Sequence, residues 1–260
     1  MVNNAGNNAW EIIMRTVLVF LTVILFLIVS LPLLLVFYII KIFNKRACAI
    51  GSQAVIKTVF RFVLFLSGAK MQVRGQENIP ADRPVLYVSN HRSFADIPMG
   101  YCTVKGPTGF IAKKEIRKVI ILRRWMENMN CLFLDRSDLR QGLKTILTAV
   151  DNVKAGYSAF IMPEGTRNHE EGLLEFKEGS FKIAEKSGCP VIPVAISNAD
   201  ALLELHFPWV KKARVAISYG EPIETADMTK EDKKQLCPKT VAVIERMLEE
   251  DREYINTAKK

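Results

Sequence analysis

PVLYVSNHRSFAD, residues 84–96, is the stretch of this chain that indicates its fold most directly. Its first half is an uninterrupted apolar run of the kind that forms a short buried strand, and the following helix is expected to begin within residues 93–99. His91 and Asp96 stand just beyond the strand in an H-x-x-x-x-D spacing. Open α/β sheets bind ligands at the carboxyl ends of their strands, so this order predicts an α/β fold with a site at His91.

Three further apolar runs also end where polar or charged side chains begin. They are residues 131–134, followed by Asp135 and Arg136; residues 158–162, followed by Glu164 and Arg167; and residues 190–196, followed by Ser197 and Asn198. If these strands are parallel, their ends share one edge, and we expect the side chains beyond them to converge with His91 and Asp96 on one cleft. The predicted fold class is therefore α/β, with a mostly parallel central sheet flanked by helices.

The residue types at these strand ends indicate acid–base chemistry beside an anion site. Histidine is the side chain best suited to taking a proton near neutral pH, and a carboxylate bonded to its second nitrogen fixes the tautomer and steadies the imidazolium. Arg136 and Arg167 each offer a planar fork of donors that matches phosphate oxygens. Gly165 would let the backbone turn closely against such a ligand. An isolated H-x-x-x-x-D is a weak signal, and a structural hydrogen bond explains it equally well.

Four motifs in this order resemble those of the glycerolipid acyltransferases. They are Asn90-His91 to Asp96, residues 133–136 (FLDR), residues 163–167 (PEGTR) and residues 191–194 (VIPV). The resemblance spans residues 71–196 and is greatest to the 1-acyl-glycerol-3-phosphate acyltransferases, which make phosphatidic acid. Four ordered motifs are far more specific than any one of them. Two departures, Asn130 for a frequent glycine and Phe94 for a frequent tryptophan, are expected to touch no chemical group.

The resemblance implies a membrane-bound enzyme of phospholipid synthesis. It would transfer a fatty acyl group from a thioester, either acyl-CoA or acyl carrier protein, to the sn-2 hydroxyl of lysophosphatidate. In that family the motif histidine is the base and the aspartate orients it, which implies these roles for His91 and Asp96. No residue in the sequence distinguishes the two donors.

The same resemblance implies where the acceptor binds. In the family, arginines of the second and third motifs are associated with the acceptor's phosphate, which implies this role for Arg136 and Arg167. We expect Glu164, Gly165 and Thr166 to complete the substrate site, with Glu164 holding Arg167 or a substrate hydroxyl.

Other functions use the same residues. His91 could activate water in a membrane-anchored thioester or lipid hydrolase, the acceptor could be another lysophospholipid, or the chain could be a non-catalytic lipid-binding scaffold. A Ser93 acyl-enzyme is a further alternative, but the chain has no G-x-S-x-G elbow, so direct transfer through His91 is preferred. Assays with labelled thioester in the presence and absence of lysolipid separate transfer from hydrolysis.

Metal and redox chemistry receive little support from the sequence. A metal site of His91, Asp96, His169 and Glu170 is conceivable, but no H-E-x-x-H or comparable ligand pattern supports it. We therefore expect no metal and no cofactor apart from the thioester co-substrate. The five cysteines are scattered without a C-x-x-C, which predicts neither a disulfide framework nor a zinc site and is typical of a reducing compartment.

The N-terminal part of the chain predicts a membrane anchor. The run from Val17 to Ile40 has no charged side chain and is long enough to cross a hydrocarbon core of about 30 Å as a helix, unless Pro32 kinks it or turns it into a hairpin. Lys41, Lys45 and Arg46 follow, which favours a retained anchor with its positive flank, and the catalytic domain, on the cytoplasmic face.

A second apolar segment, residues 54–66, carries Lys57 and Arg61, so it is expected to lie in the membrane surface with these groups snorkelling outwards; a buried core helix is the alternative. A chain of 260 residues with no internal linker beyond this point predicts one catalytic domain. We place the anchor and interfacial helix at residues 1–68 and the acyltransferase domain at residues 69–260.

The formal net charge of +9 is partly concentrated between Lys105 and Arg124, where Glu115 is the single acid beside many basic residues. An apolar stripe accompanies them, which suits anionic lipid headgroups or the phosphates of an acyl carrier, although an ordinary solvated face has the same composition. Membrane lipids are the expected partner. Nucleic acid is not expected, because the chain has an anchor and no recognisable nucleic-acid motif.

The remaining segments predict structural elements. Apolar residues at helical spacing predict a helix over residues 139–153, capped by Ser137, with its leucines in the core. We also expect a helix over residues 179–186, a late strand at Arg214 to Tyr219, and a terminal helix with Val241, Ile244 and Leu248 on its buried face.

Overall fold

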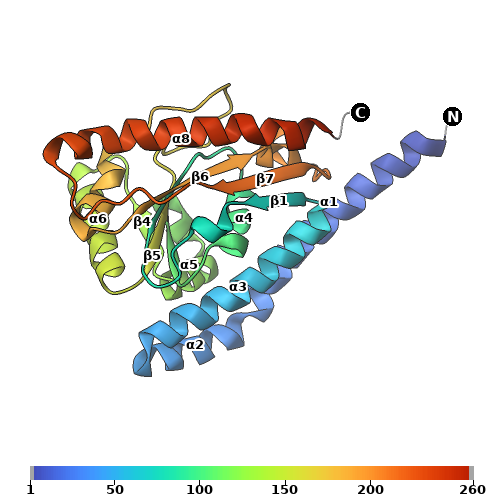
Figure 1. Cartoon of the computed structure of the whole chain (residues 1–260). Helices are drawn as coiled ribbons and strands as arrows, with labels where there is room; N and C mark the ends of the chain where they lie inside the picture. Colours follow the sequence, from blue (N-terminus) through green and yellow to red (C-terminus); the bar gives the residue numbers. More distant parts are fainter. Residues whose placement is uncertain (1–2, 258–260) are drawn as a thin grey trace.

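A seven-stranded sheet forms the centre of the fold in the computed structural model, which describes residues 3–257 (Figure 1). The strand order is β1-β7-β6-β2-β5-β3-β4. The strands are β1 (Lys70–Arg74), β2 (Leu86–Ser89), β3 (Thr108–Lys113), β4 (Leu132–Leu134), β5 (Ser158–Ile161), β6 (Val191–Ser197) and β7 (Arg214–Tyr219). Five of them, from β6 to β4, run parallel, while β7 runs antiparallel to β6 and carries β1 parallel to itself. The predicted α/β class with a mostly parallel sheet is confirmed.

The strands at the middle of the sheet are buried on both faces, which explains why they read as uninterrupted apolar runs. Tyr87 of β2 pairs in register with Phe160 on one side and Ile192 on the other. On one face of the sheet, the ring of Phe160 stacks on that of Phe110 with centroids 4.3 Å apart. The predicted strand ends therefore lie along one edge of the sheet.

Helices cover both faces of the sheet (Figure 1). The α-helices that follow β1 are α4 (Asp96–Thr103), α5 (Ile120–Asn128), α6 (Leu139–Lys154), α7 (Lys182–Ser187) and α8 (Lys230–Asn256). Short 3₁₀ helices are η1 (Gln76–Asn78), η2 (Lys114–Lys118), η3 (Glu178–Phe181), η4 (Ala199–Leu202) and η5 (Glu204–His206). One core cluster joins Tyr87 and Phe160 to Trp125 of α5, and the other joins Leu86 to α6, α7 and α8.

The first three helices are α1 (Asn3–Val29), α2 (Leu31–Phe43) and α3 (Lys45–Ser67). The uncharged run is kinked at Ser30, just before Pro32 near the start of α2, while the amide of Leu34 still donates to Ser30 O at 2.9 Å. The chain reverses only at Asn44, whose side chain caps α3 by accepting from Ala47 N at 2.9 Å. Proline thus bends the run, and α3 returns alongside α1 and α2 (Figure 1).

The helix α3 is docked on the rest of the protein. Lys57 Nζ donates to Val104 O at the end of α4 over 2.6 Å, and Gln53 bonds the backbone of Gly106 and Thr108, each over 2.7 Å. The prediction that Lys57 snorkels outwards was wrong, because the free carbonyl at the end of α4 attracts this cation. Arg61 is exposed as expected. The proposed division at residues 68 and 69 falls at Gly68, the left-handed cap of α3, and the two-domain description stays a prediction.

Two expectations for α6 were wrong. Its cap is Asp138, which accepts from Arg140 N and Gln141 N, whereas Ser137 bonds Asp135. Leu139, Leu143 and Leu147 are exposed, and the buried side chains are those of Thr145, Ile146, Ala149, Val150 and Val153. The helix lies near β4 at the edge of the sheet, so only one flank of its apolar stripe is covered. The expected elements at residues 179–186, 214–219 and in the terminal helix are present.

Candidate active site

The end of β2 is fixed to β6 by the buried side chain of Asn90. Its amide nitrogen donates to Ile196 O at 2.9 Å, and its carbonyl oxygen accepts from Ile196 N at 2.8 Å. These two bonds continue the pairing of β2 with β6 by one residue, using a side chain in place of a backbone. The next residue, His91, therefore leaves the sheet at a defined point, above its carboxyl edge.

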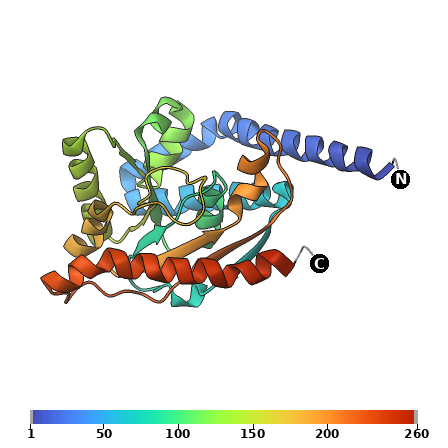
Figure 2. The same ribbon diagram turned by 90° about the horizontal axis from the view of Figure 1, so that it is seen from above.

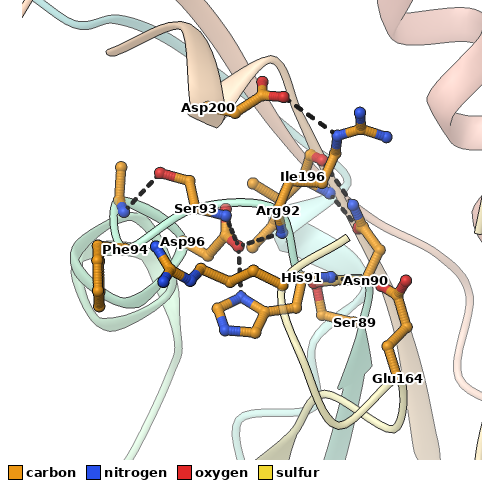
Figure 3. A network of polar contacts seen from close by, with 12 residues as sticks. Ser89, Asn90, His91, Arg92, Ser93, Phe94, Asp96, Glu164, Ile196 and Asp200 are labelled. Atoms are coloured by element: carbon orange, nitrogen blue, oxygen red, sulfur yellow. Dashed lines mark hydrogen bonds and ion pairs between the residues drawn. The ribbon is translucent and has the colours of Figure 1, made fainter. Parts of the chain in front are cut away.

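His91 and Asp96 meet as the spacing predicts (Figure 3). His91 Nδ1 lies 2.8 Å from Asp96 Oδ2, and the same oxygen accepts from the amides of Arg92 and Ser93, each at 2.8 Å. The helix begins at Asp96, so the carboxylate occupies the first turn, where helix amides and dipole favour negative charge. With Nδ1 donating to the carboxylate, the other ring nitrogen, Nε2, is the acceptor of the imidazole.

The Asp96 carboxyl is fully buried, whereas the His91 side chain is 19% exposed. Burial raises the pKa of Asp96, and the hydrogen bonds from His91, Ser93 and Arg92 oppose that rise. Asp96 Oδ1 is buried without a hydrogen-bond partner among residues 3–257. All the hydrogen bonds of this carboxyl thus fall on Oδ2 and hold the imidazole and the loop that carries it.

Glu164 supports the same loop from β5. Its Oε1 accepts from His91 N at 2.6 Å and its Oε2 accepts from Leu174 N at 2.9 Å, while burial raises its pKa. The expectation that Glu164 holds Arg167 was wrong, because both carboxyl oxygens are occupied by backbone amides. Asn168 adds a further tie, its backbone N–H donating to His91 O at 2.7 Å. Glu164 therefore positions the backbone of His91.

Arg167 is held by Glu204 and Phe94. Its Nη1 lies 3.3 Å from Glu204 Oε1, and its Cζ lies 3.9 Å from the centroid of the Phe94 ring. The expectation that Phe94 touches no proposed chemical group was therefore wrong. The guanidinium stacks on this ring, and the ring face attracts the cation.

Arg136 lies beside Gly165 of the PEGTR loop. Gly165 has a φ of +75°, and a Cβ at this position would approach Lys177 Nζ to 3.2 Å and Arg136 Cζ to 3.7 Å. Two cationic groups therefore flank a turn that only glycine adopts without strain. Thr166 is exposed.

Lys177, Asp200 and Glu204 are the residues of this site that the sequence interpretation missed. Arg92 Nε lies 3.3 Å from Asp200 Oδ2, and Glu204 accepts from Ser93 Oγ and Phe94 N, each at 2.6 Å. Asp200 and Glu204 follow β6, so the rule of charge after a strand end could have found them. Lys177 follows an irregular segment and gave no such signal.

The geometry supports neither of two alternatives raised from the sequence, a serine nucleophile and a metal site. Ser93 is buried and its hydroxyl donates to Glu204, which gives no support to a serine nucleophile. Of the suggested metal ligands, His91 and Asp96 meet, but neither His169 nor Glu170 completes a group with them, because residues 3–257 contain no group of three potential His, Cys, Asp or Glu ligands. The need for a thioester alone, without a cofactor, stays a prediction.

Comparison with known proteins shows the family. A family profile described as Acyltransferase matches residues 70–197, which include every residue of the site named above except Asp200 and Glu204. A 1-acyl-sn-glycerol-3-phosphate acyltransferase of Saccharomyces cerevisiae is 31% identical over 66% of this chain and 57% of its own length. The chloroplastic 1-acyl-sn-glycerol-3-phosphate acyltransferase BAT2 of Brassica napus is 36% identical over 52% of this chain and 39% of its own length.

A solved structure extends the likeness to the whole fold. The crystal structure of the 1-acyl-sn-glycerophosphate acyltransferase PlsC from Thermotoga maritima superposes with a TM-score of 0.80, at 24% identity, over 94% of this chain and 98% of that one. The match to the curated relatives is shorter, since this chain spans 57% and 39% of the length of the two named above. With its motifs in order and the profile matched from β1 to β6, this chain belongs to the acyltransferase family.

Proposed function

We propose that this protein transfers a fatty acyl group from a thioester to the sn-2 hydroxyl of lysophosphatidate, giving phosphatidic acid. The observation that carries the proposal is the His91–Asp96 pair, with Nδ1 bonded to the buried carboxyl and Nε2 left as the acceptor. The relatives named above support the choice of acceptor, since they are 1-acyl-sn-glycerol-3-phosphate acyltransferases.

The proposed reaction is one direct transfer. As the acceptor oxygen attacks the thioester carbonyl, its proton passes to His91 Nε2; the carbon–sulfur bond then breaks, and the proton passes to the departing thiolate. Asp96 stabilises the imidazolium formed in between. No covalent bond to the protein forms, in keeping with the engagement of the Ser93 hydroxyl by Glu204.

The acceptor's phosphate fits the cationic side of the site. Arg136 and Lys177 flank the Gly165 turn, where a ligand can approach the backbone closely. Arg167 enters from the Phe94 side, and it can exchange its contact with Glu204 for one with the phosphate. The donor is acyl-CoA or acyl carrier protein, and the basic stretch of residues 105–124 suits the phosphates of either.

The N-terminal helices support membrane association. Residues 9–29 and 45–67 lie in helices long and apolar enough to cross a bilayer, and the side chains of the first are almost all uncovered. The uncharged run contacts the catalytic part near both of its ends. Val210 N donates to Thr16 Oγ1 at 2.9 Å, and Lys41 Nζ donates to Glu127 O at 3.3 Å. This favours a helix lying along the membrane beside the domain, with the domain on the cytoplasmic face that the basic residues after the run indicate.

An assay with labelled acyl-CoA, in the presence and absence of lysophosphatidate, tests the proposal. We expect label in phosphatidic acid only when the acceptor is present, and little free fatty acid in its absence. Release of free fatty acid at the same rate without acceptor would identify a hydrolase. The absence of any turnover with either thioester donor would favour a lipid-binding scaffold, and transfer to other lysophospholipids at equal rates would refute the assignment of the acceptor.

A further inference from the structure

Residues 203–212, which we call the docking loop, connect β6 to β7 and display large apolar side chains. Leu205, Phe207 and Trp209 are 61%, 70% and 44% exposed. A single exposed apolar residue is ordinary on a protein surface, but three at alternate positions of one short loop indicate a surface that something covers. None of them is needed for the packing of the sheet.

The docking loop is held in place although its tip is exposed. Leu202 and Val210 are buried at its base, and Lys211 N donates to Leu202 O at 2.9 Å, which closes the loop. Within it, Trp209 N donates to His206 O at 2.8 Å. The backbone thus presents its apolar side chains outwards from a fixed base.

The position of the docking loop matches that of a membrane surface. It lies beside α1 (Figure 2), where Val210 N donates to Thr16 Oγ1. Thr16 and Arg15 are the last polar residues before the uncharged run that starts at Val17, and Arg15 is itself bonded to Leu66 O. The loop therefore meets α1 at the point where the uncharged run begins, beside the part of the helix proposed to lie along the membrane.

The composition of the docking loop points to the same partner. Trp and Phe favour the boundary between headgroups and hydrocarbon, and Lys211 and Lys212 follow them, as suits an anionic surface. We propose that the docking loop inserts Leu205, Phe207 and Trp209 into the surface of an anionic bilayer.

Insertion of this loop would bring the catalytic residues to the lipid. Glu204, at its base, accepts from Ser93 Oγ and Phe94 N in the loop that carries His91. Phe94 itself is 58% exposed. The inference rests on the membrane association proposed above but not on turnover. Failure of the loop to insert and failure of the chain to transfer an acyl group can therefore be told apart.

Quenching of Trp209 by brominated lipids tests the inference. The intact chain carrying Trp10→Phe is compared with the same chain carrying Trp209→Phe as well, so that the difference in emission isolates Trp209 from the buried Trp125. In vesicles of phosphatidylcholine and phosphatidylglycerol, we expect this difference to be quenched, and more strongly by bromines near the headgroup than near the chain end. Unquenched emission from chains that sediment with the vesicles would overturn the inference, as would failure to sediment.

Two substitutions and a matched control sharpen the test. Phe207→Ser should reduce the quenching of Trp209 by removing an apolar contact with lipid, and Lys212→Glu should reduce it in anionic vesicles only. Leu139→Ser changes a side chain that is 90% exposed on α6, away from the loop, and should leave quenching unchanged. Equal effects of Phe207→Ser and Leu139→Ser, or a blue shift of Trp209 that depends on protein concentration and not on lipid, would overturn the proposal, the latter in favour of a second copy.

Discussion

The proposed chemistry depends on one hydrogen bond, from His91 Nδ1 to Asp96 Oδ2 over 2.8 Å. Replacing His91 by Ala should lower kcat by a factor of about 10² to 10⁴, the usual contribution of general-base catalysis. Asp96→Asn should also be severely impaired, because an amide neither balances the imidazolium nor sets its tautomer. Steady-state rates on lysophosphatidate measure both, with thermal unfolding as the control for folding. If His91→Ala kept most of the activity, the mechanism would be wrong.

Glu204 is expected to act through its neighbours. Glu204→Ala removes the acceptor for Ser93 Oγ and Phe94 N, and should lower kcat about tenfold by loosening the loop that carries His91. Glu204→Gln keeps an acceptor oxygen and should restore most of that loss. Glu224, whose carboxylate pairs with Arg83 on the exposed surface, provides the control, and Glu224→Gln should leave kcat unchanged. Equal losses in the Ala and Gln variants of Glu204 would show that its charge, and not its hydrogen bonds, matters.

Arg136 and Lys177, the cationic groups beside Gly165, are expected to bind the acceptor's phosphate. Arg136→Ala and Lys177→Ala should each weaken the use of lysophosphatidate by about 1.5 to 3 kcal/mol, the cost of losing a charge-assisted hydrogen bond. Arg136→Lys should rescue only in part, since a point charge lacks the planar fork.

The check is a comparison of lysophosphatidate with uncharged monoacylglycerol on the parent enzyme and on each variant. The variants should lose activity on the charged acceptor alone. A loss by the same factor on both acceptors would assign these residues to folding or to the donor.

Among the elements, α8 is tied to the sheet by one buried carboxyl. Asp251 accepts from Ser197 Oγ of β6 and Ser218 Oγ of β7, each at 2.8 Å, and lies 2.7 Å from Arg74 Nη2 of β1. Asp251→Ala would remove the acceptor of both serine hydroxyls and the nearer of the two carboxylates beside Arg74, and should lower the free energy of unfolding by about 2 to 5 kcal/mol. Asp251→Asn should cost less, because its amide oxygen still accepts. Urea unfolding of the three chains measures this.

The free energy of unfolding should depend on pH through the titration of Asp251. Burial raises the pKa of Asp251 above its unfolded value of about 4, so the folded state binds the proton more tightly. The stabilisation that comes from this raised pKa is therefore complete below about pH 4, and it is lost as the pH rises through the folded-state pKa of Asp251. The stability of the parent relative to Asp251→Asn should fall over that interval, and a rise would contradict the assignment.

The elements show how far the sequence could predict the site. Each apolar run that ends in polar or charged residues forms a strand of the parallel part of the sheet. Three of these strands are buried on both faces, which explains their uninterrupted apolar pattern, while β4 is a half-buried edge strand. His91 meets Asp96 as the motif predicts. What the sequence could not give are contacts made by irregular segments. Glu204 and Lys177 reach the site through loop conformations that no periodicity records, and Arg167 is bound by Glu204 and not by Glu164 for the same reason.

For the whole molecule, the N-terminal helices are part of the core as well as the proposed membrane contact. The rings of Phe26 and Phe37 lie 5.5 Å and 5.6 Å from that of the fully buried Trp125, whose indole N–H donates to Ser30. Deleting residues 1–43 should therefore release most of the protein from vesicles and also lower its melting temperature. A weaker, salt-sensitive attachment should persist through the basic residues.

Sedimentation with vesicles at low and high salt, beside thermal unfolding in detergent, checks both parts of this expectation. Full recovery of the truncated chain with the vesicles, or an unchanged melting temperature, would contradict it.

The reversed direction of β7 and β1 has a consequence for how the protein is built around its substrate. Because β7 runs back against β6, the segment joining them stays at the edge where the chemistry is, and β1, paired in register from Lys70 with Arg214, starts at that edge too. The end of α3, which precedes β1, therefore lies at the same edge of the sheet. Had both strands run with the others, the chain would have entered the sheet from the opposite rim. Two strand reversals thus bring the end of α3, the loop between β6 and β7, and His91 to one edge of the sheet, so an acceptor that arrives along the N-terminal helices would meet the histidine at that same edge.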